Sequence, residues 1–578
     1  MATEDEARRV ADFPKLILLG YPSSGARRIA QAVSALGENA ILGFGGKLAE
    51  RIALGRLTGR APFDQWPRAR MYADLELIAP PCRPWVEGYR AFDWLHHWYP
   101  EALFVLNTRA EEDWVARLWA RDEGRYRAHH AARRGVAQEA LPEIWLRERE
   151  AHHAAVRGYF DGQGYREQGG FTEVTAEEPL EQVLERLSRR PSAPAPRGAP
   201  DAPAAPAVSR GGGAIKPSDP AFVQSLVAHC LPRSGEGALA DQPDGRMVQG
   251  HWDGQGAPLS AEGKDLGLTL VETRQGGRFL ADSRGHKAVR GEGFLNDYAL
   301  HGGAGPVWFD MGDARRFGGA VKGPEHPHFM YNRRPAACNV TLWPLPGHHD
   351  PGLAGSFRDM GGEGAFGRGF AHREDRVIWR GALSGQMRYL DEGGVLRHRG
   401  AFYAINRLRE DPQADVSEGL ESLVRYRLTR RMRGRAGYDL GVTLPRRQGF
   451  LADLPCFKGV IAEPVPMRAQ ANCRYILSLS GYDAGSNFPA AICAGSLVIK
   501  EEDGWEKFYT GAFRPMEHYL PMALGGGDLE DRVDWARAHP EACAEMVRAG
   551  QSVAMKLADP ANIGAMKQAL IEDYAARV

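Results

Sequence analysis

A run of proline, alanine, glycine and serine at residues 191–213 is the feature that most limits how this chain folds. Its sequence, PSAPAPRGAPDAPAAPAVSRGGG, has too few large apolar side chains to offset the entropy lost on ordering. Its prolines favour extended polyproline II, which keeps the segments on either side apart. We therefore expect a disordered linker at 191–213, a folded domain at 1–190 and further folded structure from residue 214 onward.

Short apolar segments recur after the linker, and stretches of helical character separate them. This alternation indicates an α/β fold with parallel strands. The 578 residues exceed what one hydrophobic core supports. The region after the linker is long enough for two Rossmann-like domains, which we place at 214–435 and 436–578.

Composition limits the functional classes. Lysine plus arginine (73) equals aspartate plus glutamate (73), so net charge gives no reason to expect nucleic-acid binding. The seven cysteines include no CxxC pair, which argues against a thiolate metal site and for reduced thiols in the cytoplasm. The apolar runs are strand-sized, so any membrane contact is expected to be peripheral, at the inner face.

The first domain contains a candidate phosphate-binding loop. KLILLG (15–20) is a predicted strand and Ala26–Leu36 a predicted helix, with GYPSSGARR (20–28) spanning the turn between them. Free backbone N–H groups and the helix dipole at such a turn favour a phosphate. Ala26 and Arg27 stand where a Walker A loop has lysine and serine or threonine, so an ATPase or kinase is not supported.

This loop resembles the sulfate-donor loop of the sulfotransferase family, Pro-(Arg/Lys)-Ser/Thr-Gly-Thr, through Pro22, Ser24 and Gly25. The resemblance extends to MYADLE at 71–76 and to residues 94–118, where Arg109 fits the arginine that holds the donor's 3′-phosphate. It covers about residues 14–190 and implies a P-loop α/β fold with 3′-phosphoadenosine 5′-phosphosulfate as its ligand.

The same segments depart from the sulfotransferase pattern at several positions. Ser23 replaces the basic residue of the loop, Ala26 its threonine, and Arg117 the serine expected after Arg109. Losing a cation beside a transferring sulfuryl group costs several kcal/mol of transition-state stabilisation, unless Arg27 or Arg28 replaces it. Two alternatives stay open: an active sulfotransferase, or a retained fold that binds acceptor or forms oligomers.

After the linker, two predicted strands end in groups that suit transfer chemistry. PVWFDMGD (306–313) places Asp313 just past a strand, where it serves either as a general base or as the cap of the next helix. VIWRGALSG (377–385) places Arg380 at a strand end with Gly381 and Gly385. That arginine binds either a diphosphate or a surface carboxylate.

Two later segments complete the candidate site. SGYDAGSN (480–487) is a glycine-rich turn between a strand and a helix, which favours a phosphorylated ligand. GWEKFYTGAFRPMEHYLPM (504–522) mixes aromatic and charged side chains that either sandwich a base or sugar or belong to the core. The predicted donor-binding residues of the two segments and the strand between them are Gly481, Asp483, Gly485, Ser486, Asn487, Lys500 and His518.

The order WRGxxxG, YDLGVT, SGYDAGSN, CAGSLVIK and WEKFY…RPMEHYLP resembles glycosyltransferase family 90, which includes capsule- and lipopolysaccharide-modifying transferases and protein O-glucosyltransferases. The resemblance spans about residues 215–578. It implies a GT-B fold of two Rossmann-like domains and inverting, metal-independent transfer from a nucleotide diphosphate sugar, expected to be a UDP-sugar. Asp313 then matches the family's base and Arg380 its donor-binding arginine. Asn487 stands where eukaryotic members carry another arginine.

The expected function is therefore glycosyl transfer to a bacterial surface glycan or its lipid-linked precursor. Alternatives are a bifunctional glycosyltransferase and sulfotransferase, or a non-catalytic first domain that binds acceptor or forms oligomers. The arginine-rich run RYRLTRRMRGR (425–435) fits either a solvated helix face or a surface for anionic lipid or glycan. No metal site is expected.

Overall fold

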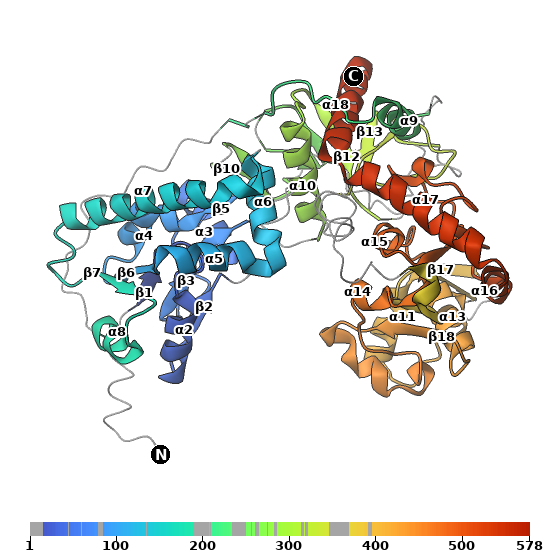
Figure 1. The fold of residues 1–578 in the computed structure, drawn as a ribbon, viewed down its shortest axis with the longest axis horizontal. Helices are drawn as coiled ribbons and strands as arrows, with labels where there is room; N and C mark the ends of the chain where they lie inside the picture. The colour runs from blue at the N-terminus through green and yellow to red at the C-terminus, as the bar shows by residue number, and fades with distance from the viewer. Residues whose placement is uncertain are drawn as a thin grey trace. The chain divides into compact units, whose positions relative to one another are not determined.

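The computed structural model forms two compact units (Figure 1). Unit 1 comprises Met1–Arg210 and Asp265–Leu300, and unit 2 comprises Gly211–Lys264 and His301–Val578. The structure describes residues 15–578 apart from 44–45, 59, 79–84, 135, 189–206, 209, 234–249, 256, 261–264, 274–275, 282–285, 314–316, 318–321, 346–368 and 391–395. Most of the predicted linker at 191–213 therefore lies outside the described residues.

Unit 1 is built on a five-stranded parallel sheet of order β2-β3-β1-β6-β7. Its strands are β1 (Leu16–Leu18), β2 (Ala40–Leu42), β3 (Met71–Ala73), β6 (Leu103–Thr108) and β7 (Phe171–Thr175). The surrounding helices are α2 (Ala26–Ala35), α3 (Lys47–Thr58), α4 (Phe92–Trp98), α5 (Glu111–Ala120), α6 (Arg125–Arg134), α7 (Leu141–Gly162) and α8 (Leu180–Leu187). The strand predicted at 15–20 and the helix predicted from Ala26 are confirmed.

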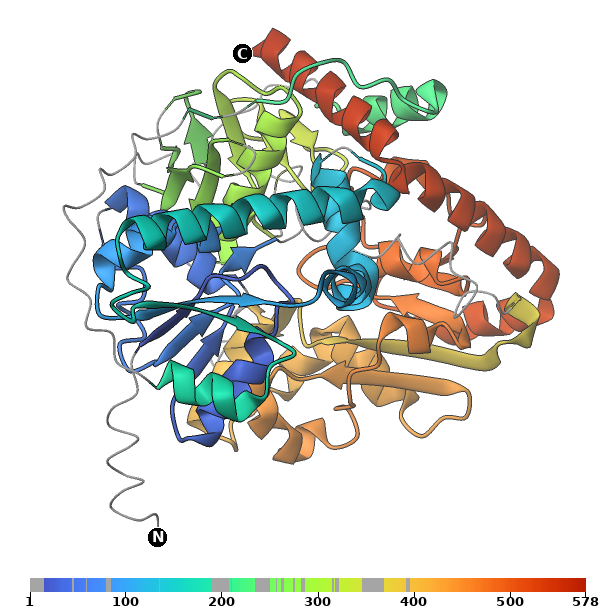
Figure 2. The ribbon, with the colours of Figure 1, turned by 60° about the vertical axis from the view of Figure 1, so that its left-hand side comes forward.

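Each face of this sheet has its own core, which is why its strands are continuously apolar. Leu16 and Leu18 of β1 point to a core completed by α2 and α8. Ile17 and Leu19 point to the opposite core, where α3, α4, α5 and α7 pack. Figures 1 and 2 show the long α7 lying across one side of the sheet.

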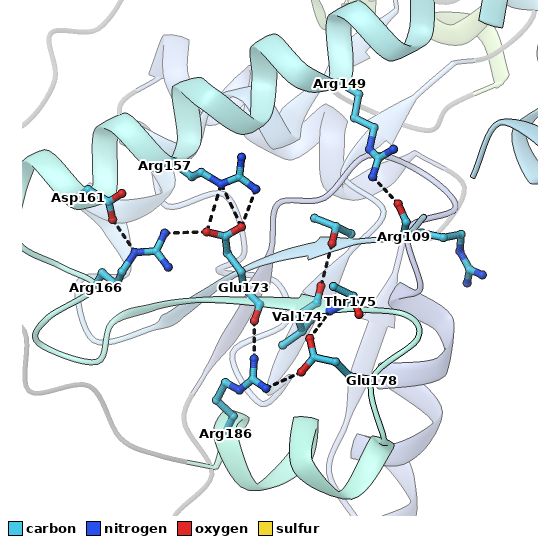
Figure 3. A network of polar contacts seen from close by, with 11 residues as sticks. Arg109, Arg149, Arg157, Asp161, Arg166, Glu173, Val174, Thr175, Glu178 and Arg186 are labelled. Atoms are coloured by element: carbon cyan, nitrogen blue, oxygen red, sulfur yellow. Dashed lines mark hydrogen bonds and ion pairs between the residues drawn. The ribbon is translucent and has the colours of Figure 1, made fainter. Parts of the chain in front are cut away.

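Ion pairs fix the edge strand β7 to the helices around it (Figure 3). The Glu173 carboxylate accepts hydrogen bonds from Arg157 and Arg166, and its backbone carbonyl accepts one from Arg186. Burial favours a higher pKa for Glu173, but Arg157 and Arg166 outweigh it and hold the pKa below its ordinary value. The network fixes β7 to α7 and α8, while backbone pairing joins β7 to β6, the strand that leads to Arg109.

The segment Asp265–Leu300, expected to belong to the region after the linker, groups with unit 1 instead. It forms the hairpin β10 (Leu268–Val271) and β11 (Arg278–Ala281), followed by α10 (His286–Leu300). Val271 and Leu280 of the hairpin are buried in one cluster with Ala49 and Ala53 of α3 and with Leu77 and Val86, which lie in β4 (Glu76–Leu77) and β5 (Val86–Glu87). Burial of these apolar side chains joins segments that are far apart in the sequence.

Unit 2 contains two five-stranded sheets. The first has the order β14-β13-β12-β8-β9, with β12, β13 and β14 parallel and β8 antiparallel to both of its neighbours. Its strands are β8 (Gly250–Trp252), β9 (Leu259–Ser260), β12 (Val307–Asp310), β13 (His328–Met330) and β14 (Val340–Leu342).

The second sheet is parallel throughout, of order β18-β15-β19-β20-β21. Its strands are β15 (Glu374–Ala382), β18 (Tyr438–Thr443), β19 (Cys473–Ser478), β20 (Leu497–Glu501) and β21 (Leu520–Met522). The expected boundary at 435/436 separates β15 from β18, yet these two strands pair from Val377↔Tyr438 to Ala382↔Thr443. Backbone hydrogen bonds thus put β15 in the second Rossmann-like layer. The α/β class is confirmed for both units.

The helices of unit 2 cover the second sheet and return to the first. The helices are α9 (Pro220–Cys230), α11 (Ala401–Glu410), α12 (Ser417–Ser422), α13 (Val424–Met432), α14 (Met467–Gln470), α15 (Phe488–Cys493), α16 (Leu529–Ala538), α17 (Pro540–Ala558) and α18 (Pro560–Arg577), with a hairpin of β16 (Gln386–Leu390) and β17 (Leu396–Gly400). Tyr574 of α18 accepts a hydrogen bond from the Trp308 backbone of β12 at 2.9 Å. Cys543 and Met546 of α17 lie in the core of the second sheet, so α17 and α18 together connect the two sheets.

The arginine-rich run lies on and just after α13, where all six arginines contact neighbouring parts of unit 2. Arg425, Arg427, Arg431 and Arg433 donate to backbone carbonyls, and Arg430 and Arg435 pair with Glu421 and Glu530. The run therefore fixes turns of unit 2. Within the described part of the chain, no helix combines the length and apolar character needed to cross a membrane.

A buried carboxyl group lies near the carboxyl end of the unit 1 sheet. Glu76 accepts hydrogen bonds of 3.0 and 3.2 Å from the Tyr126 hydroxyl, and its side chain is 3% exposed. Burial raises the pKa of Glu76 to about 7, although Arg121 at 3.9 Å opposes the shift. The folded protein thus holds a proton here that the unfolded chain releases at lower pH.

We expect Glu76→Gln to stabilise unit 1 at pH 8 and not at pH 4. Between the ordinary glutamate pKa and about 7 the folded state binds one more proton, so wild-type stability falls as pH rises through this window. The shift corresponds to roughly 3 kcal/mol at most. The stability difference is measured by amide hydrogen exchange of β6, comparing the variant with wild type at pH 4 and at pH 8. The exposed Glu143→Gln is the control, and an equal Glu76→Gln effect at both pH values contradicts the account.

Candidate functional site

A cavity of about 960 Å³ opens in unit 2 where the strands of the second sheet end. Its walls come from the turns that follow β15, β19, β20 and β21, from α12 and α13, and from the segment after β13. Ligands of open parallel sheets bind in this position, beyond the carboxyl ends of the strands. The lining residues include Arg334, Ser384, Gly385, Arg427, Gly481, Tyr482, Glu501, Asp503 and Trp505.

The floor of the cavity is the glycine-rich turn after β19. The Gly481 amide donates to the Asp483 carbonyl at 2.8 Å, and a Cβ on Gly481 would lie 2.8 Å from Ser384 Oγ and 3.0 Å from Arg425. Arg425 donates to the carbonyls of Leu479 and Ser480 from below. Burial lowers the pKa of Arg425 to about 10. A side chain at position 481 would force Ser384 or the partly buried Arg425 to shift, so this close packing favours glycine.

Glu501, at the end of β20, joins two walls of the cavity. Its carboxylate accepts from the Ser480 amide at 2.8 Å, from the Ser480 hydroxyl at 2.7 Å and from the Gly525 amide at 2.8 Å. The glycine-rich turn and the turn after β21 are therefore held by one buried side chain, which is 1% exposed.

Two arginines give the cavity a positive wall. Arg427 of α13 donates to the carbonyls of Gly525 and Glu421, each at 2.9 Å. Arg334 lies over the Trp505 ring at 4.0 Å, and burial lowers its pKa. Guanidinium groups in this setting suit a diphosphate, and an aromatic ring suits a base or sugar.

A polar cluster at the edge of the cavity joins the two sheets of unit 2. Asp313 follows β12, and Tyr331 and Asn332 follow β13, whereas Asp483 follows β19. The Tyr331 hydroxyl contacts Asp313 Oδ1 and lies 2.5 Å from Asp483 Oδ2, to which Asn332 Nδ2 donates at 2.8 Å. Lys507 Nζ lies 3.4 Å from Asp483 Oδ1.

Asp313 also lies close to the cavity wall. Burial and the Asp313 carboxylate raise the pKa of Tyr482, which lines the cavity. The residue is exposed, so an incoming hydroxyl can reach its carboxylate. Burial lowers the pKa of Lys507, and the charge of Asp483 opposes that shift. An accessible carboxylate thus lies beside a cation-lined cavity.

The structure brings some of the predicted site residues together. Gly385 and Gly481 line the cavity, while Asp313 and Asp483 meet through Tyr331. The sequence reasoning did not assign roles to Tyr331, Asn332, Arg334, Arg427 or Lys507. The segment YNRRP (331–335) directly follows β13, which is the signal that selected Asp313 and that could have found Tyr331, Asn332 and Arg334.

Other predicted residues lie away from the cavity lining. Arg380 of β15 is held by the Asp439 side chain at 2.7 Å and by the carbonyls of Trp379, Asp439 and Glu463. Asn487 donates to the Leu477 carbonyl. Lys500 bonds Glu501 and Glu502 beside Tyr519, and His518 Nδ1 accepts from the Arg514 amide. The residues that line the cavity also exclude Gly381, Gly485 and Ser486.

In unit 1 the Gly20–Arg28 loop connects β1 to α2. The loop is fixed at its carbonyls: Asn107 Nδ2 donates to Ser24 at 3.0 Å, Trp114 to Pro22 at 2.9 Å, and Arg109 Nε to Ser23 at 3.1 Å. After β1 the chain continues to β2 at one edge of the sheet, and after β6, which lies next to β1, it continues to β7 at the other edge. The loop after β1 and Arg109 after β6 therefore lie at the topological switch point, where open α/β sheets bind ligands.

The loop leaves room for about one water molecule at its inner side. A cavity of about 10 Å³ there is lined by Ser24, Gly25 and Arg28 together with residues of β7 and α8. Ser24 is 1% exposed, and its hydroxyl has no hydrogen-bond partner among the described residues. Arg27 is exposed at the N-terminus of α2, and Pro22 is buried.

Among the residues that the structure describes, no group of three or more histidine, cysteine, aspartate or glutamate side chains is placed to hold a metal ion. The sequence pair His348-His349 followed by Asp350 lies outside the described residues.

Comparison with known proteins points to the same region as the cavity. Residues 455–578 match the model of Glycosyl transferase family 90. Protein O-glucosyltransferase 3 of Mus musculus is 28% identical over 104 residues, 18% of this chain and 21% of the relative. Protein O-glucosyltransferase 1 of Mus musculus is 22% identical over 113 residues, 20% and 29% of the two chains. Protein O-glucosyltransferase 2 of Danio rerio is 26% identical over 81 residues, 14% and 16%.

These matches show that residues 455–578, which contribute to the parallel α/β layer of the second sheet, are similar to glycosyltransferases of this family. The matched region contains β19, β20 and β21, the strands whose ends form the floor and one wall of the cavity. The chain aligns with less than a third of the length of these relatives.

We expect Arg427→Gln to weaken binding of UDP by roughly tenfold to a hundredfold, the loss of one charge-assisted contact to a phosphate. Arg430→Gln is the matched control, since Arg430 lies on the same helix, pairs with Glu421 and is not among the cavity-lining residues. Calorimetric titration of the full chain measures both, with GDP used if UDP gives no heat. Equal losses in the two variants contradict a diphosphate site beside Arg427.

Proposed function

We propose that unit 2 is an inverting glycosyltransferase of GT-B architecture. It moves a sugar from a nucleotide diphosphate sugar, a UDP-sugar in the first instance, to a hydroxyl of a bacterial surface glycan or its lipid-linked precursor. The observation that carries the proposal is that Asp313, from the first sheet, is linked through Tyr331 to Asp483, on the glycine-rich turn that lines the cavity of the second sheet.

The cavity supplies contacts for each part of such a donor. Arg427 and Arg334 neutralise the diphosphate, which is the leaving group. The Trp505 ring offers a face for the base or sugar, and Asp503 lines the cavity beside it. Gly385 and Gly481 let the donor approach the backbone. In this arrangement Arg380 supports β15 and β18 instead of touching the donor.

The reaction is a single displacement. The Asp313 carboxylate removes the proton from the acceptor hydroxyl as its oxygen attacks the anomeric carbon. The bond from that carbon to the diphosphate oxygen breaks, and its electron pair stays on the nucleoside diphosphate. One displacement from the face opposite the leaving group inverts the anomeric configuration. The proton ends on Asp313 and then passes to solvent.

Asp313→Asn should reduce transfer by about a hundredfold or more while leaving UDP affinity within about threefold, because an amide cannot accept the proton. The assay measures hydrolysis and transfer across a panel of UDP- and GDP-sugars. Asp411→Asn, an exposed aspartate of unit 2 that caps a turn, serves as control. Full transfer activity in Asp313→Asn would show that Asp313 is not the base.

For unit 1, the unpartnered Ser24 hydroxyl at the switch-point loop favours a second candidate function. We propose that the Gly20–Arg28 loop, the N-terminus of α2 and Arg109 bind a 3′-phosphoadenosine ligand, with sulfation of the same glycan as the associated reaction. If the loop binds no such ligand, the fold is retained as an acceptor-binding or oligomerising module.

We expect the full chain to bind adenosine 3′,5′-bisphosphate and Arg109→Ala to lose that binding by about tenfold or more. Arg117→Ala is the matched control, because both arginines contact Asp113 and only Arg109 also contacts the loop, at Ser23. Calorimetry measures the affinities. Absence of binding by wild type, or an equal loss in the two variants, removes the sulfotransferase proposal.

A further inference from the structure

Asp503, which follows β20 closely, presents one carboxyl oxygen to the cavity. The residue is 6% exposed and lines the cavity wall. Its Oδ1 accepts a hydrogen bond from the Trp505 amide at 2.9 Å, which fixes the side chain in a short turn. Oδ2 has no hydrogen-bond partner among the residues that the structure describes, and protein atoms do not enclose it. This oxygen is therefore a fixed acceptor that faces the cavity.

The turn that carries Asp503 is held from its other side by Arg334. Nη1 of Arg334 donates to the Asp503 carbonyl, and the guanidinium group lies 4.0 Å from the centre of the Trp505 ring. Gly504 between them has φ +71°, and a Cβ there would lie 3.0 Å from Arg334 Nη1. Both features favour glycine. Asp503, Arg334 and Trp505 thus form a corner of fixed geometry, in which an open acceptor lies next to a cation.

The lysines near Asp503 contact other carboxylates. Nζ of Lys500 lies 3.4 Å from Glu502 Oε1. Nζ of Lys507 lies 3.4 Å from Asp483 Oδ1. Burial raises the pKa of Asp503, and the charges of Lys500 and Lys507 oppose that shift. A carboxylate that has lost hydrating water in this way is stabilised by an O–H or N–H group that a ligand supplies.

The charge of Asp503 restricts which part of a nucleotide diphosphate sugar lies against it. A phosphate beside this carboxylate is disfavoured by repulsion, so the diphosphate lies toward the arginines and a neutral part of the donor reaches Oδ2. Both rings that flank the diphosphate, the ribose and the transferred sugar, carry vicinal hydroxyl groups. A hydroxyl donates one hydrogen bond, which matches a single open carboxylate oxygen.

We propose that Asp503 recognises a hydroxyl group of the donor, on the ribose or on the transferred sugar, through a hydrogen bond that Oδ2 accepts. The proposal rests on donor binding by unit 2. Asp503 acts here as a binding residue, and neither a proton nor a covalent bond is exchanged. Selectivity follows because a ligand without this hydroxyl leaves Oδ2 both dehydrated and unpaired.

Asp503→Asn tests this role with little change of shape. The amide oxygen still accepts from the Trp505 backbone, whereas the cavity-facing atom becomes an N–H donor that cannot accept from a hydroxyl. We expect donor affinity to fall by about tenfold to a hundredfold. Calorimetry of the full chain measures it with UDP, its 2′- and 3′-deoxy analogues and a panel of UDP-sugars, or with the guanosine series if UDP gives no heat.

Asp411→Asn is the matched control. Oδ1 of Asp411 accepts from the Gln413 amide in the same kind of turn, and Asp411 is exposed and not among the cavity-lining residues. Its affinity should stay within about twofold of wild type. Asp503→Ser, whose hydroxyl also supports such a turn, replaces Asp503→Asn if that variant does not fold, with the same loss expected. Wild-type affinity for every ligand in the folded Asp503 variant overturns the proposal.

The ligand series distinguishes the two sources of the hydroxyl. If the ribose supplies it, UDP and UDP-sugars lose affinity alike in Asp503→Asn. Wild type then binds UDP at least tenfold more tightly than one of the deoxy analogues, and the variant does not. If the transferred sugar supplies it, the variant keeps wild-type affinity for UDP and loses affinity for the UDP-sugar alone.

Failure of this site and failure of the proposed function give different results. Donor binding that depends on Asp503, without transfer from any nucleotide sugar, supports the hydroxyl site and removes the glycosyltransferase. Transfer that depends on Asp313, with unchanged donor affinity in Asp503→Asn, removes the hydroxyl site and leaves the function. A full chain that binds neither nucleoside diphosphates nor nucleotide sugars overturns both.

Discussion

Unit 2 depends on the buried guanidinium of Arg333, which is 2% exposed. It donates to the Glu506 carboxylate at 2.9 Å, to the carbonyls of Leu231 and Val340 at 2.8 Å, and to that of His229 at 2.5 Å. The backbones of Arg333 and Glu506 also exchange two hydrogen bonds, of 3.0 and 2.8 Å. One side chain thus joins the end of α9, the first sheet and the loop after β20. Removing either Arg333 or Glu506 would leave the other charge buried and unpaired, which destabilises the fold. The contacts of the two side chains therefore depend on each other.

The geometry of the candidate site follows from that junction. Because Arg333 is fixed against Glu506, the preceding Tyr331 and Asn332 lie against Asp483. Lys507, the residue after Glu506, contacts the same Asp483 carboxylate. The same segment carries Arg334 to Trp505 in the cavity wall. The contact between Arg333 and Glu506 therefore positions both the Tyr331 hydroxyl beside Asp313 and the Arg334–Trp505 part of the cavity wall. The general-base catalysis that we propose depends on such positioning. Glu501 and Arg425 perform the corresponding task inside the second sheet, where they hold the glycine-rich turn.

Sequence reasoning predicted the features that depend on local pattern. Apolar runs ending in glycine located the strands, and the rule that ligands bind beyond strand ends selected Asp313, Gly385 and Gly481. It did not predict contacts made by distant residues. Arg380 looked available for a diphosphate because its partner Asp439 is 59 residues away. The pairing of β15 with β18 placed the sheet across the expected boundary at 435/436, and the packing of Val271 and Leu280 on α3 moved Asp265–Leu300 into unit 1. Arg427 is one of the six arginines in the run 425–435, and the sequence does not show which of the six lines the cavity.

A crystal structure of the full chain with the nucleoside diphosphate that it binds tests the central claim most directly. The account predicts the diphosphate beside Arg427 and Arg334, the glycines of the two turns against the ligand, and the open side of the phosphate facing Asp313. A nucleoside diphosphate bound elsewhere in unit 2, or only at the Gly20–Arg28 loop of unit 1, would contradict it.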